Sequence, residues 1–414
     1  MSLNRVVITG MGAVSPYGLG VSVFIDKLFK GKSAVVNMEN EWAPAINDLM
    51  CYVGAPFSET INEKEIPRKF RKTMGKTAIF AYLAVKEALQ YSDIHDGQLS
   101  SCRLGISFGS STGSAESTER FFVEHLNTKS ARSLPSGIFF QVMSHTSAAN
   151  IAQALNICGR VISPNSACSS SAQAIGFAYE MIQCGHQDIM LCGGSDELHV
   201  TTSASFDMVQ AASYKYNNNP SATPRPFDKD RDGTVCGEGA GCIILESETS
   251  AKKRGVKILG EVVGFATNAS GVHMAHANST SIVRCMQDAL QSAKINPTEI
   301  DYINAHATGT VIGDISEAEA INQVFNSHKV PVSSIKGYFG HTLGASGVLE
   351  LIAVLKMMET DTIIPTHNLN EPDEKCRGIN HVQSIINKKI NTIIKNSFAF
   401  GGINTVLIIK RYST

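Results

Sequence analysis

The sequence predicts a duplicated α/β fold, and three observations support this. Short apolar runs of the strand type alternate with longer segments of helical period. This series of strands and helices starts a second time after residues 252–255 (Lys-Lys-Arg-Gly). Thirty-four glycines among 414 residues suit a fold with many tight turns. We expect an N-terminal half at residues 1–250, which carries the insertions, and a C-terminal half at residues 251–414, with helices covering parallel-type sheets.

In the first half, we expect strands where short apolar runs meet glycine or turn residues, and helices where apolar residues recur at three- and four-residue spacing. Residues 20–70 contain Trp42 and three prolines, and they indicate irregular connections. The expected elements are, in order, a strand at 5–9 bounded by Gly10 and Gly12, a helix at 76–90, a strand at 104–108, a helical insertion at 115–150, a helix starting at or next to Cys168, a strand at 188–192 ending at Gly193-Gly194, a loop at 220–241 and a strand at 242–246.

The second half follows the same rules. Its first strand resembles the strand that opens the chain. The expected elements are, in order, a strand at 258–265, a helix at 282–293, a strand at 302–305, a helix at 315–325, an apolar helix at 348–358, and a segment at 392–398 that leads to a final strand at 405–410.

Composition excludes several classes of protein. Charged residues make up 18 % of the chain and the formal net charge is -1, so no basic field indicates nucleic acid and no Lys/Arg cluster indicates a lipid surface. The first ten residues lack a signal-peptide pattern, and no apolar stretch could span a bilayer. Ten scattered cysteines form no Cys-x-x-Cys pair and no zinc-type cluster. We therefore expect a cytoplasmic protein with reduced thiols, no metal and no membrane insertion.

Four motifs imitate binding sites. Gly10-Met-Gly12 lacks the third glycine of a dinucleotide fingerprint, and a tight turn explains it better. Residues 31–33 (Gly-Lys-Ser) lack the first glycine of a phosphate loop. Residues 228–233 resemble a calcium loop but misplace the closing glutamate, so we expect a structural loop. His273 and His276 have no third ligand nearby and are expected in solvent or in the core.

Cys168 is the first candidate catalytic residue. A short apolar run from Val161 ends in a Pro-Asn-Ser turn, and a helix of small residues follows. A thiol at such a helix start meets unpaired N–H groups and the positive end of the helix dipole. Both favour the thiolate, so we expect a lowered pKa and an exposed nucleophile. The alternative is a buried core cysteine, which is the usual state of a free Cys.

Two histidines are its candidate partners. His306 follows an apolar run that ends in Asn-Ala, and catalytic groups of α/β folds gather at such strand ends. His341 lies in a glycine-rich turn before an apolar helix. Glu350 is a charge within that helix, and a buried charge needs a partner, for which Lys336 is the nearest choice.

One Cys and two His at separate strand ends suit acyl transfer through a thioester. The thiol can take the acyl group, and two neutral imidazoles can donate N–H bonds to one thioester oxygen. That oxygen becomes negative when a malonyl group loses carbon dioxide and forms an enolate. A simple Cys hydrolase needs a single His, so the second histidine is the informative residue.

Taken together, Cys168, His306, Lys336, His341 and Glu350 make the chain resemble the elongating β-ketoacyl-acyl-carrier-protein synthases of the thiolase superfamily. The resemblance covers essentially the whole length. The motifs that carry it are Val6-Val-Ile-Thr-Gly-Met-Gly-Ala-Val-Ser-Pro, Asn165-Ser-Ala-Cys-Ser-Ser, Arg225-Pro-Phe-Asp, Arg231-Asp-Gly, Gly237-Glu-Gly-Ala-Gly, the segments around His306 and His341, and Asn396-Ser-Phe-Ala-Phe-Gly-Gly.

The resemblance implies a thiolase-like, duplicated five-layered α-β-α-β-α fold that dimerises, and a two-stage reaction. An acyl group passes from acyl carrier protein to Cys168, and malonyl-carrier protein then loses carbon dioxide and attacks the acyl-enzyme. Substrates would arrive on the phosphopantetheine arm, with no further cofactor. By resemblance, His306 and His341 promote decarboxylation, and Lys336, held by Glu350, orders the site.

The resemblance also assigns supporting residues. The backbone N–H groups of Cys168 and Phe400 would form the oxyanion hole, with Phe400 as a gate. Substrate contacts are expected from Thr112, Thr308, Thr310, Phe398 and Ala399. Asp314 and Glu317 match acidic positions near Lys336, and a helix capping box explains them at least as well.

The sequence departs from the family pattern in places. Ala307 replaces a glycine, and Ala399 and Ile403 replace a glycine and a threonine near the gate. A Cβ at position 399 restricts the backbone, so gate movement is expected to differ. Thr112 stands where some members carry a bulky apolar residue, and its hydroxyl suits an oxygenated or unsaturated chain.

Four functions remain open. The departures favour the catalytic subunit of a type II polyketide or polyene system, paired in a heterodimer with a chain-length factor. The alternative is a fatty-acid elongating synthase that forms a homodimer. A non-catalytic chain-length subunit would lack Cys168. A degradative thiolase would need a second catalytic cysteine, and neither Cys285 nor Cys376 fits that role.

Overall fold

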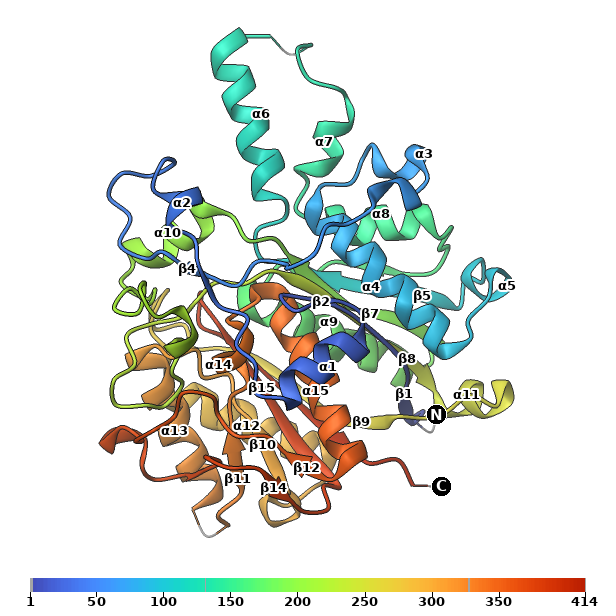
Figure 1. The fold of residues 1–414 in the computed structure, drawn as a ribbon. Helices are drawn as coiled ribbons and strands as arrows, with labels where there is room; N and C mark the ends of the chain where they lie inside the picture. The colour runs from blue at the N-terminus through green and yellow to red at the C-terminus, as the bar shows by residue number, and fades with distance from the viewer. Residues whose placement is uncertain (1–2, 131, 327, 414) are drawn as a thin grey trace.

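The computed structural model describes residues 3–130, 132–326 and 328–413. Its strands form one mixed sheet of twelve, in the order β13-β11-β10-β15-β16-β9-β1-β8-β7-β5-β6, with β2 paired to β1 (Figure 1). The strands are β1 (Val6–Ser15), β2 (Gly18–Leu19), β5 (Leu104–Gly109), β6 (Val161–Ile162), β7 (Ile189–Asp196), β8 (Gly239–Ser247), β9 (Gly260–Ala269), β10 (Tyr302–Asn304), β11 (Pro331–Ser333), β13 (Asn380–His381), β15 (Thr392–Ala399) and β16 (Ile403–Lys410). Two small ribbons pair β3 (Val36–Asn37) with β4 (Val53–Gly54), and β12 (Thr362–Ile363) with β14 (Ile386–Asn387).

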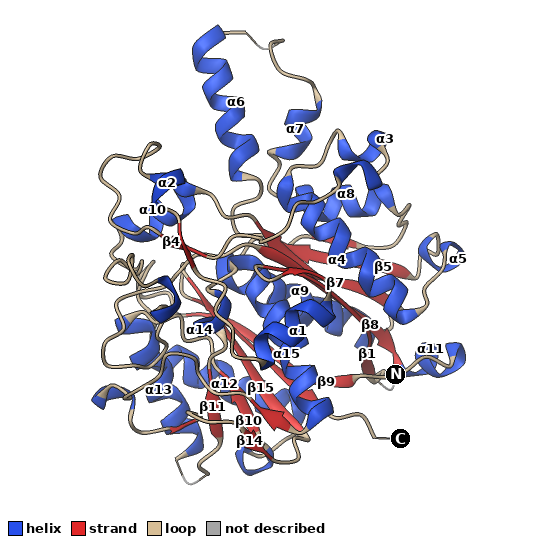
Figure 2. Cartoon of the chain, in the orientation of Figure 1, coloured by secondary structure: helices blue, strands red, loops and turns tan. Residues whose placement is uncertain are grey.

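Helices cover the sheet, and Figure 2 separates them from the strands by colour. They are α1 (Val21–Phe29), α2 (Glu39–Trp42), α3 (Arg68–Arg71), α4 (Lys76–Ser92), α5 (Asp96–Leu99), α6 (Ala115–Thr128), α7 (Gly137–Gln141), α8 (Thr146–Ala154), α9 (Ser170–Gln183), α10 (Val200–Met208), α11 (Glu248–Arg254), α12 (Ser279–Ala293), α13 (Val311–Phe325), α14 (Lys336–Phe339) and α15 (Ser346–Thr360). None of the helices in the described part of the chain is long and apolar enough to cross a membrane.

The two parts of the sheet repeat one topology. Each part has five strands, which can be counted from one to five along the chain. Their order across the sheet is third, second, fourth, fifth and first, both in β6-β5-β7-β8-β1 and in β11-β10-β15-β16-β9. In both, the first two pairings are parallel and the last two are antiparallel. Antiparallel neighbours need no crossover helix, and β15 and β16 are joined by a short turn. The expectation of parallel-type sheets was therefore wrong for the centre of the sheet.

Five layers follow from the packing. Helices α9 and α15 lie between the two parts of the sheet and contact strands of both. Helices α4 and α8 cover the outer face of one part, and α12 and α13 that of the other. Helix α15 is apolar around most of its circumference, with Leu349, Leu351 and Ile352 fully buried, as a central helix requires. This arrangement matches the expected α-β-α-β-α fold.

Several boundaries differ from the expected ones. Strand β1 continues through Gly10 and Gly12, which are not in a turn; they let α4 approach, since a Cβ at Gly12 would come within 2.0 Å of the Ala84 carbonyl oxygen. Strand β7 likewise continues through its two glycines to Asp196. Helix α1 lies where irregular structure was expected. The helical insertion at 115–150 is confirmed, and α6 and α7 project from the body of the molecule (Figure 1).

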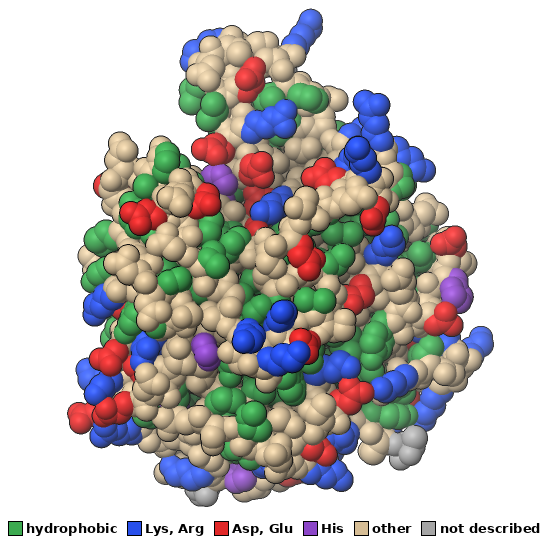
Figure 3. Space-filling view, viewed as in Figure 1, with side chains coloured by type: hydrophobic (Ala, Val, Ile, Leu, Met, Phe, Trp, Pro, Cys, Tyr) green, Lys and Arg blue, Asp and Glu red, His purple; other side chains and the backbone are tan. Residues whose placement is uncertain are grey.

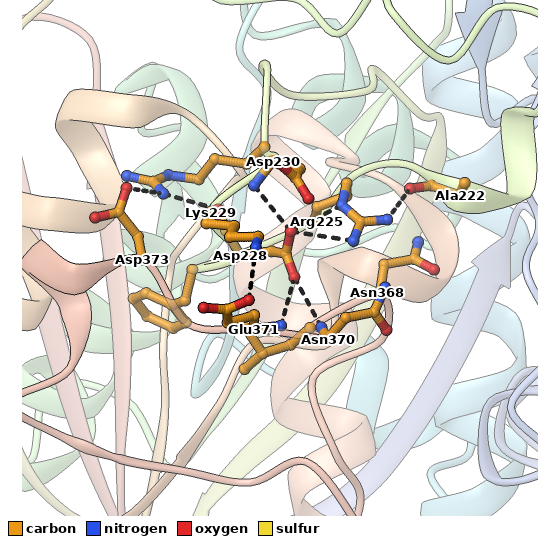
Figure 4. Close-up of polar contacts among 12 residues, drawn as sticks. Ala222, Arg225, Asp228, Lys229, Asp230, Asn368, Asn370, Glu371 and Asp373 are labelled. Atoms are coloured by element: carbon orange, nitrogen blue, oxygen red, sulfur yellow. Dashed lines mark hydrogen bonds and ion pairs between the residues drawn. The ribbon is translucent and has the colours of Figure 1, made fainter.

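The segment that imitates a calcium loop is a structural loop, as expected. Asp228 is buried and pairs with Arg225 at 3.0 Å, and its oxygens accept N–H groups of Asp230, Asn370 and Glu371 (Figure 4). Five donors therefore saturate this carboxylate.

Replacing Asp228 with Ala should destabilise the fold strongly, because it leaves the Arg225 guanidinium buried without its carboxylate. We expect the free energy of unfolding to fall by about 3–5 kcal/mol in urea titrations. The exposed neighbour Asp230 provides the control, and Asp230→Ala should change that free energy by less than about 0.5 kcal/mol. Equal effects of the two substitutions would contradict the importance of the buried pair.

Candidate active site

A tight turn before α9 presents Cys168. Ala167 has φ of 47°, a left-handed conformation that costs free energy for a residue with a Cβ. The hydroxyl of Ser170 donates to the Ala167 carbonyl at 2.7 Å and accepts the N–H of Ser166 at 3.0 Å, which holds the turn. A 3₁₀ turn at Ala167–Ser169 then continues into α9. The predicted position of Cys168 beside a helix start is confirmed.

The Cys168 thiol is nevertheless buried, and this corrects two expectations. The residue is only 6 % exposed, so its small neighbours do not leave it open to solvent. Burial raises the pKa of Cys168 to about 12, because desolvation of the thiolate outweighs the favourable effects of the Lys336 ammonium and of the N–H groups of Cys168 and Phe400. The predicted lowering of this pKa was wrong, since burial favours the neutral thiol of Cys168 over the thiolate.

His306 and His341 meet Cys168 in one cavity. The Cys168 sulfur and one ring nitrogen of each histidine all lie within 4.8 Å of one another. The two rings are edge to face, with centroids 5.3 Å apart. Within the described ranges, Nδ1 of His306 and Nε2 of His341 are buried without a hydrogen-bond partner. Three segments that are far apart in the sequence therefore converge as predicted.

The surroundings of both imidazoles favour the neutral form. Burial lowers the pKa of His306 and of His341 well below its usual value, and the positive charges of Lys336 and Lys395 lower it further. Nδ1 of His341 lies 2.8 Å from the hydroxyl oxygen of Ser346. When Ser346 donates to Nδ1, the ring proton of His341 resides on the unpartnered Nε2. A neutral N–H donor of this kind suits a developing negative charge.

Acidic residues of α13 hold the loop that follows His306. Glu317 accepts the backbone N–H of His306 at 2.9 Å and that of Ala307 at 2.7 Å. Asp314 accepts the N–H of Gly309 at 3.2 Å. The helix begins at Val311 and neither carboxylate caps it, so the capping-box alternative was wrong. Both residues support the histidine loop.

Lys336 and Glu350 form the expected buried ion pair, with both side chains fully inaccessible. A second lysine was missed. Lys395 of β15 lies 2.6 Å from the other oxygen of Glu350 and is equally inaccessible. A charged residue inside the apolar run at 392–398 is the signal that could have identified it, as it identified Glu350.

The cavity beside these residues has a volume of about 220 Å³. It is lined by most of the predicted site residues: Cys168, His306, Ala307, Thr308, Thr310, Glu317, His341, Phe398, Ala399 and Phe400. The hydroxyl oxygens of Thr308 and Thr310 are 3.1 Å apart. Phe398 packs edge to face on His306, with centroids 5.8 Å apart. His276 also lines the cavity, where its ring stacks on the exposed His273.

The turn between β15 and β16 carries Phe400. Its ring lies 5.4 Å from that of Phe206 and is 37 % exposed. Gly401 and Gly402 have φ of 86° and 72°, so the freedom of this turn resides in them. Ala399 precedes the turn within the strand, paired with Ile403, and its Cβ is accommodated there. An effect of Ala399 on gating stays a prediction.

Thr112 lies apart from the cavity. It is exposed in the single chain, and its hydroxyl donates to Asp196 at 3.3 Å. Asp196, which was missed, is fully buried and also accepts N–H groups of Ser111 and Gly344. A carboxylate directly after the Gly-Gly-Ser of a buried strand is the signal that could have revealed it.

Comparisons with known proteins agree with this fold. The model of the Beta-ketoacyl synthase, N-terminal domain matches residues 3–251, and that of the Beta-ketoacyl synthase, C-terminal domain matches residues 259–370. The 3-oxoacyl-acyl-carrier-protein synthase 1 of Haemophilus influenzae is 34 % identical over 413 residues, covering 99 % of this chain and 100 % of the relative. The Escherichia coli K12 protein of the same name is 32 % identical over 415 residues, covering 99 % of each.

Solved structures give the same picture. A beta-ketoacyl synthase from Burkholderia phymatum STM815 has a TM-score of 0.95 and 39 % identity, covering 99 % of this chain and 100 % of that one. A type II PKS ketosynthase solved with its acyl-carrier protein and bound to the hexaketide has a TM-score of 0.90 and 28 % identity. The ishigamide ketosynthase/chain length factor has a TM-score of 0.91 and 28 % identity. Both of these cover 100 % of each chain.

The fold and the site together define a condensing acyltransferase of the thiolase-like class. Two lines of comparison narrow this class to one family. The N-terminal and C-terminal domain models both match, and relatives exceed 30 % identity along the whole chain. The chain belongs to the β-ketoacyl synthase family.

Proposed function

We propose that the protein joins a Cys168-bound acyl chain to malonyl-acyl-carrier protein by decarboxylative Claisen condensation. The observation that carries this proposal is the meeting of one thiol with two neutral histidines in a single cavity. In the first stage the Cys168 sulfur attacks the acyl thioester, and its proton goes to the departing pantetheine thiol. The N–H groups of Cys168 and Phe400 face the developing oxyanion.

In the second stage the malonyl carboxylate leaves as carbon dioxide. His306 and His341 donate N–H bonds to the thioester oxygen of the resulting enolate. The enolate carbon attacks the acyl carbonyl, the carbon–sulfur bond to Cys168 breaks, and the thiolate regains a proton from solvent. The products are β-ketoacyl-carrier protein and free enzyme, so the chemistry draws on the substrates and these side chains without a further cofactor.

The test is direct. The purified protein is given acyl- and malonyl-carrier protein, and carbon dioxide and β-ketoacyl-carrier protein are measured. Hydrolysis of the acyl thioester without condensation would reject the proposal. Degradative thiolase activity is disfavoured, because Cys168 is the sole cysteine among the described residues that line the cavity.

Two pathways suit this chemistry. Fatty-acid elongation is supported by the relatives named 3-oxoacyl-acyl-carrier-protein synthase 1, which are 34 % and 32 % identical along the whole chain. A polyketide or polyene pathway is favoured by the departures at Ala307 and Ala399. Thr112 gives the polyketide pathway less support, since its hydroxyl binds Asp196 and Thr112 does not line the cavity. We therefore favour elongation by a homodimer and retain the polyketide subunit as the second candidate.

The exposed apolar surface of α6 and α7 is suited to contact with a partner subunit. Phe122, Leu126 and Phe139 there are 55 %, 60 % and 61 % exposed, and hydrophobic atoms are visible on this projection (Figure 3). The native mass of the protein, purified alone and then co-expressed with its genetic neighbours, separates the pathways. An active homodimer supports elongation, whereas activity only beside a homologue without the catalytic cysteine supports the polyketide pathway.

A further inference from the structure

Lys395 is a fully buried cation that the proposed mechanism does not use. Its ammonium forms an ion pair with Glu350 Oε2 at 2.6 Å and donates to Ser397 Oγ at 3.1 Å and to the carbonyl of Asn396. Burial lowers the pKa of Lys395, and the negative charge of Glu350 opposes this lowering, since a carboxylate accepts from an ammonium and cannot donate to a neutral amine. The surroundings therefore favour the ammonium form.

Two ammonium groups thus share one carboxylate. Lys336 binds Oε1 of Glu350 and Lys395 binds Oε2, all of them inaccessible to solvent. A single lysine would neutralise Glu350, so the second adds a positive charge to this trio, and the buried carboxylate of Glu317 also acts on both lysines. Both ammonium groups act on His306 and His341 as well, which suits a site where negative charge develops during the reaction.

The end of β15 also connects the three segments that carry the catalytic groups. Lys395 binds Glu350, the partner of Lys336. The side chain of Asn396 donates to Glu317 at 2.8 Å, and Glu317 holds the backbone of His306. The carbonyl of Ser397 accepts the hydroxyl of Ser169 at 3.0 Å, next to Cys168. Three consecutive residues of one strand therefore fix the relative positions of nucleophile, histidine loop and ion pair.

We propose that Lys395 is a positioning residue for the decarboxylation half-reaction. Its ammonium orients Glu350 and Lys336, and its charge keeps His306 and His341 in the neutral, N–H-donating form. This inference rests on the proposed condensation and adds to it a residue that acts through its neighbours.

The first test compares Lys395→Met with the unaltered protein in two half-reactions. Release of carbon dioxide from malonyl-carrier protein should fall roughly 10- to 100-fold, while acyl transfer to Cys168 stays within about threefold. Lys389→Met, at an exposed position six residues away, is the matched control and should change neither rate. Because the unaltered protein is assayed in parallel, failure of the proposed function shows as no condensation in any sample.

The second test asks whether charge is what matters. Lys395→Ala removes a propylammonium group, so added propylammonium should recover part of the lost decarboxylation, whereas neutral 1-propanol should not. Equal recovery with both additives would show that only volume is needed and would overturn the proposal. Equal loss of both half-reactions in Lys395→Met would overturn it as well.

The third readout is the pH profile. Positive neighbours disfavour protonation of an imidazole, so removing Lys395 should raise the pKa of His306 and His341 and move the acidic limb of decarboxylation to higher pH. The titratable groups that line the cavity with the two rings are Cys168, Asp232, His276 and Glu317, and the buried trio of Lys336, Glu350 and Lys395 acts on the rings as well. An unmoved limb would contradict the electrostatic role.

Discussion

Replacing Cys168 with Ala should abolish both transfer of the acyl group to the enzyme and condensation. The cavity offers no other described cysteine to take the acyl group, so the loss should reach roughly 10³-fold or more, as for nucleophiles of other acyl-transfer enzymes. Covalent loading can be followed by the intact mass of the protein after incubation with acyl-carrier protein. Condensation is followed by the β-ketoacyl product.

The same variant should still release carbon dioxide from malonyl-carrier protein, because His306 and His341 remain in place. This separation of half-reactions distinguishes loss of the nucleophile from loss of the fold. Cys158→Ala is the control, since that thiol is free, exposed and outside the cavity, and it should load and condense normally. A stable acyl adduct on Cys168→Ala would remove the nucleophile assignment.

The sequence predicts the components of the site better than their environment. Cys168 and His306 could be identified because each follows an apolar run, and His341 because it lies in a glycine-rich turn before an apolar helix; such positions converge in α/β folds. The pKa of Cys168 could not be predicted, because its sign depends on how far tertiary packing excludes water. Dipoles at the helix start act locally, and their effect on the thiolate is smaller than that of its desolvation.

The fold shows the same division. Apolar periodicity located the main helices and strands, but the antiparallel centre of the sheet depends on pairing between distant segments, such as β9 with β16. Thr112 could be placed beside the substrate only by resemblance, and its hydroxyl is bound instead to Asp196, 84 residues further along the chain. Lys395 was missed because Glu350 already had an expected partner in Lys336, so no second cation was expected beside it.

Replacing His341 with Ala should block decarboxylation and leave acylation of Cys168 largely intact. The substitution removes the N–H donor expected at Nε2, which is buried and unpartnered among the described residues. Loss of one such donor to a developing oxyanion costs about 2.7–4 kcal/mol, or roughly 10²- to 10³-fold in rate. The measurement is carbon dioxide release from malonyl-carrier protein, with acyl loading followed by intact mass in the same preparation.

Two further variants make this result specific. His341→Gln retains an amide N–H donor in the same direction and should recover part of the decarboxylation rate, which a cavity-forming Ala cannot do. His186→Ala, at an exposed position on the turn after α9, should leave both half-reactions unchanged. If carbon dioxide release were unimpaired in His341→Ala, the enolate would have to be stabilised by His306 and the backbone alone. The second histidine, which separates this site from a simple cysteine hydrolase, would then have no chemical role.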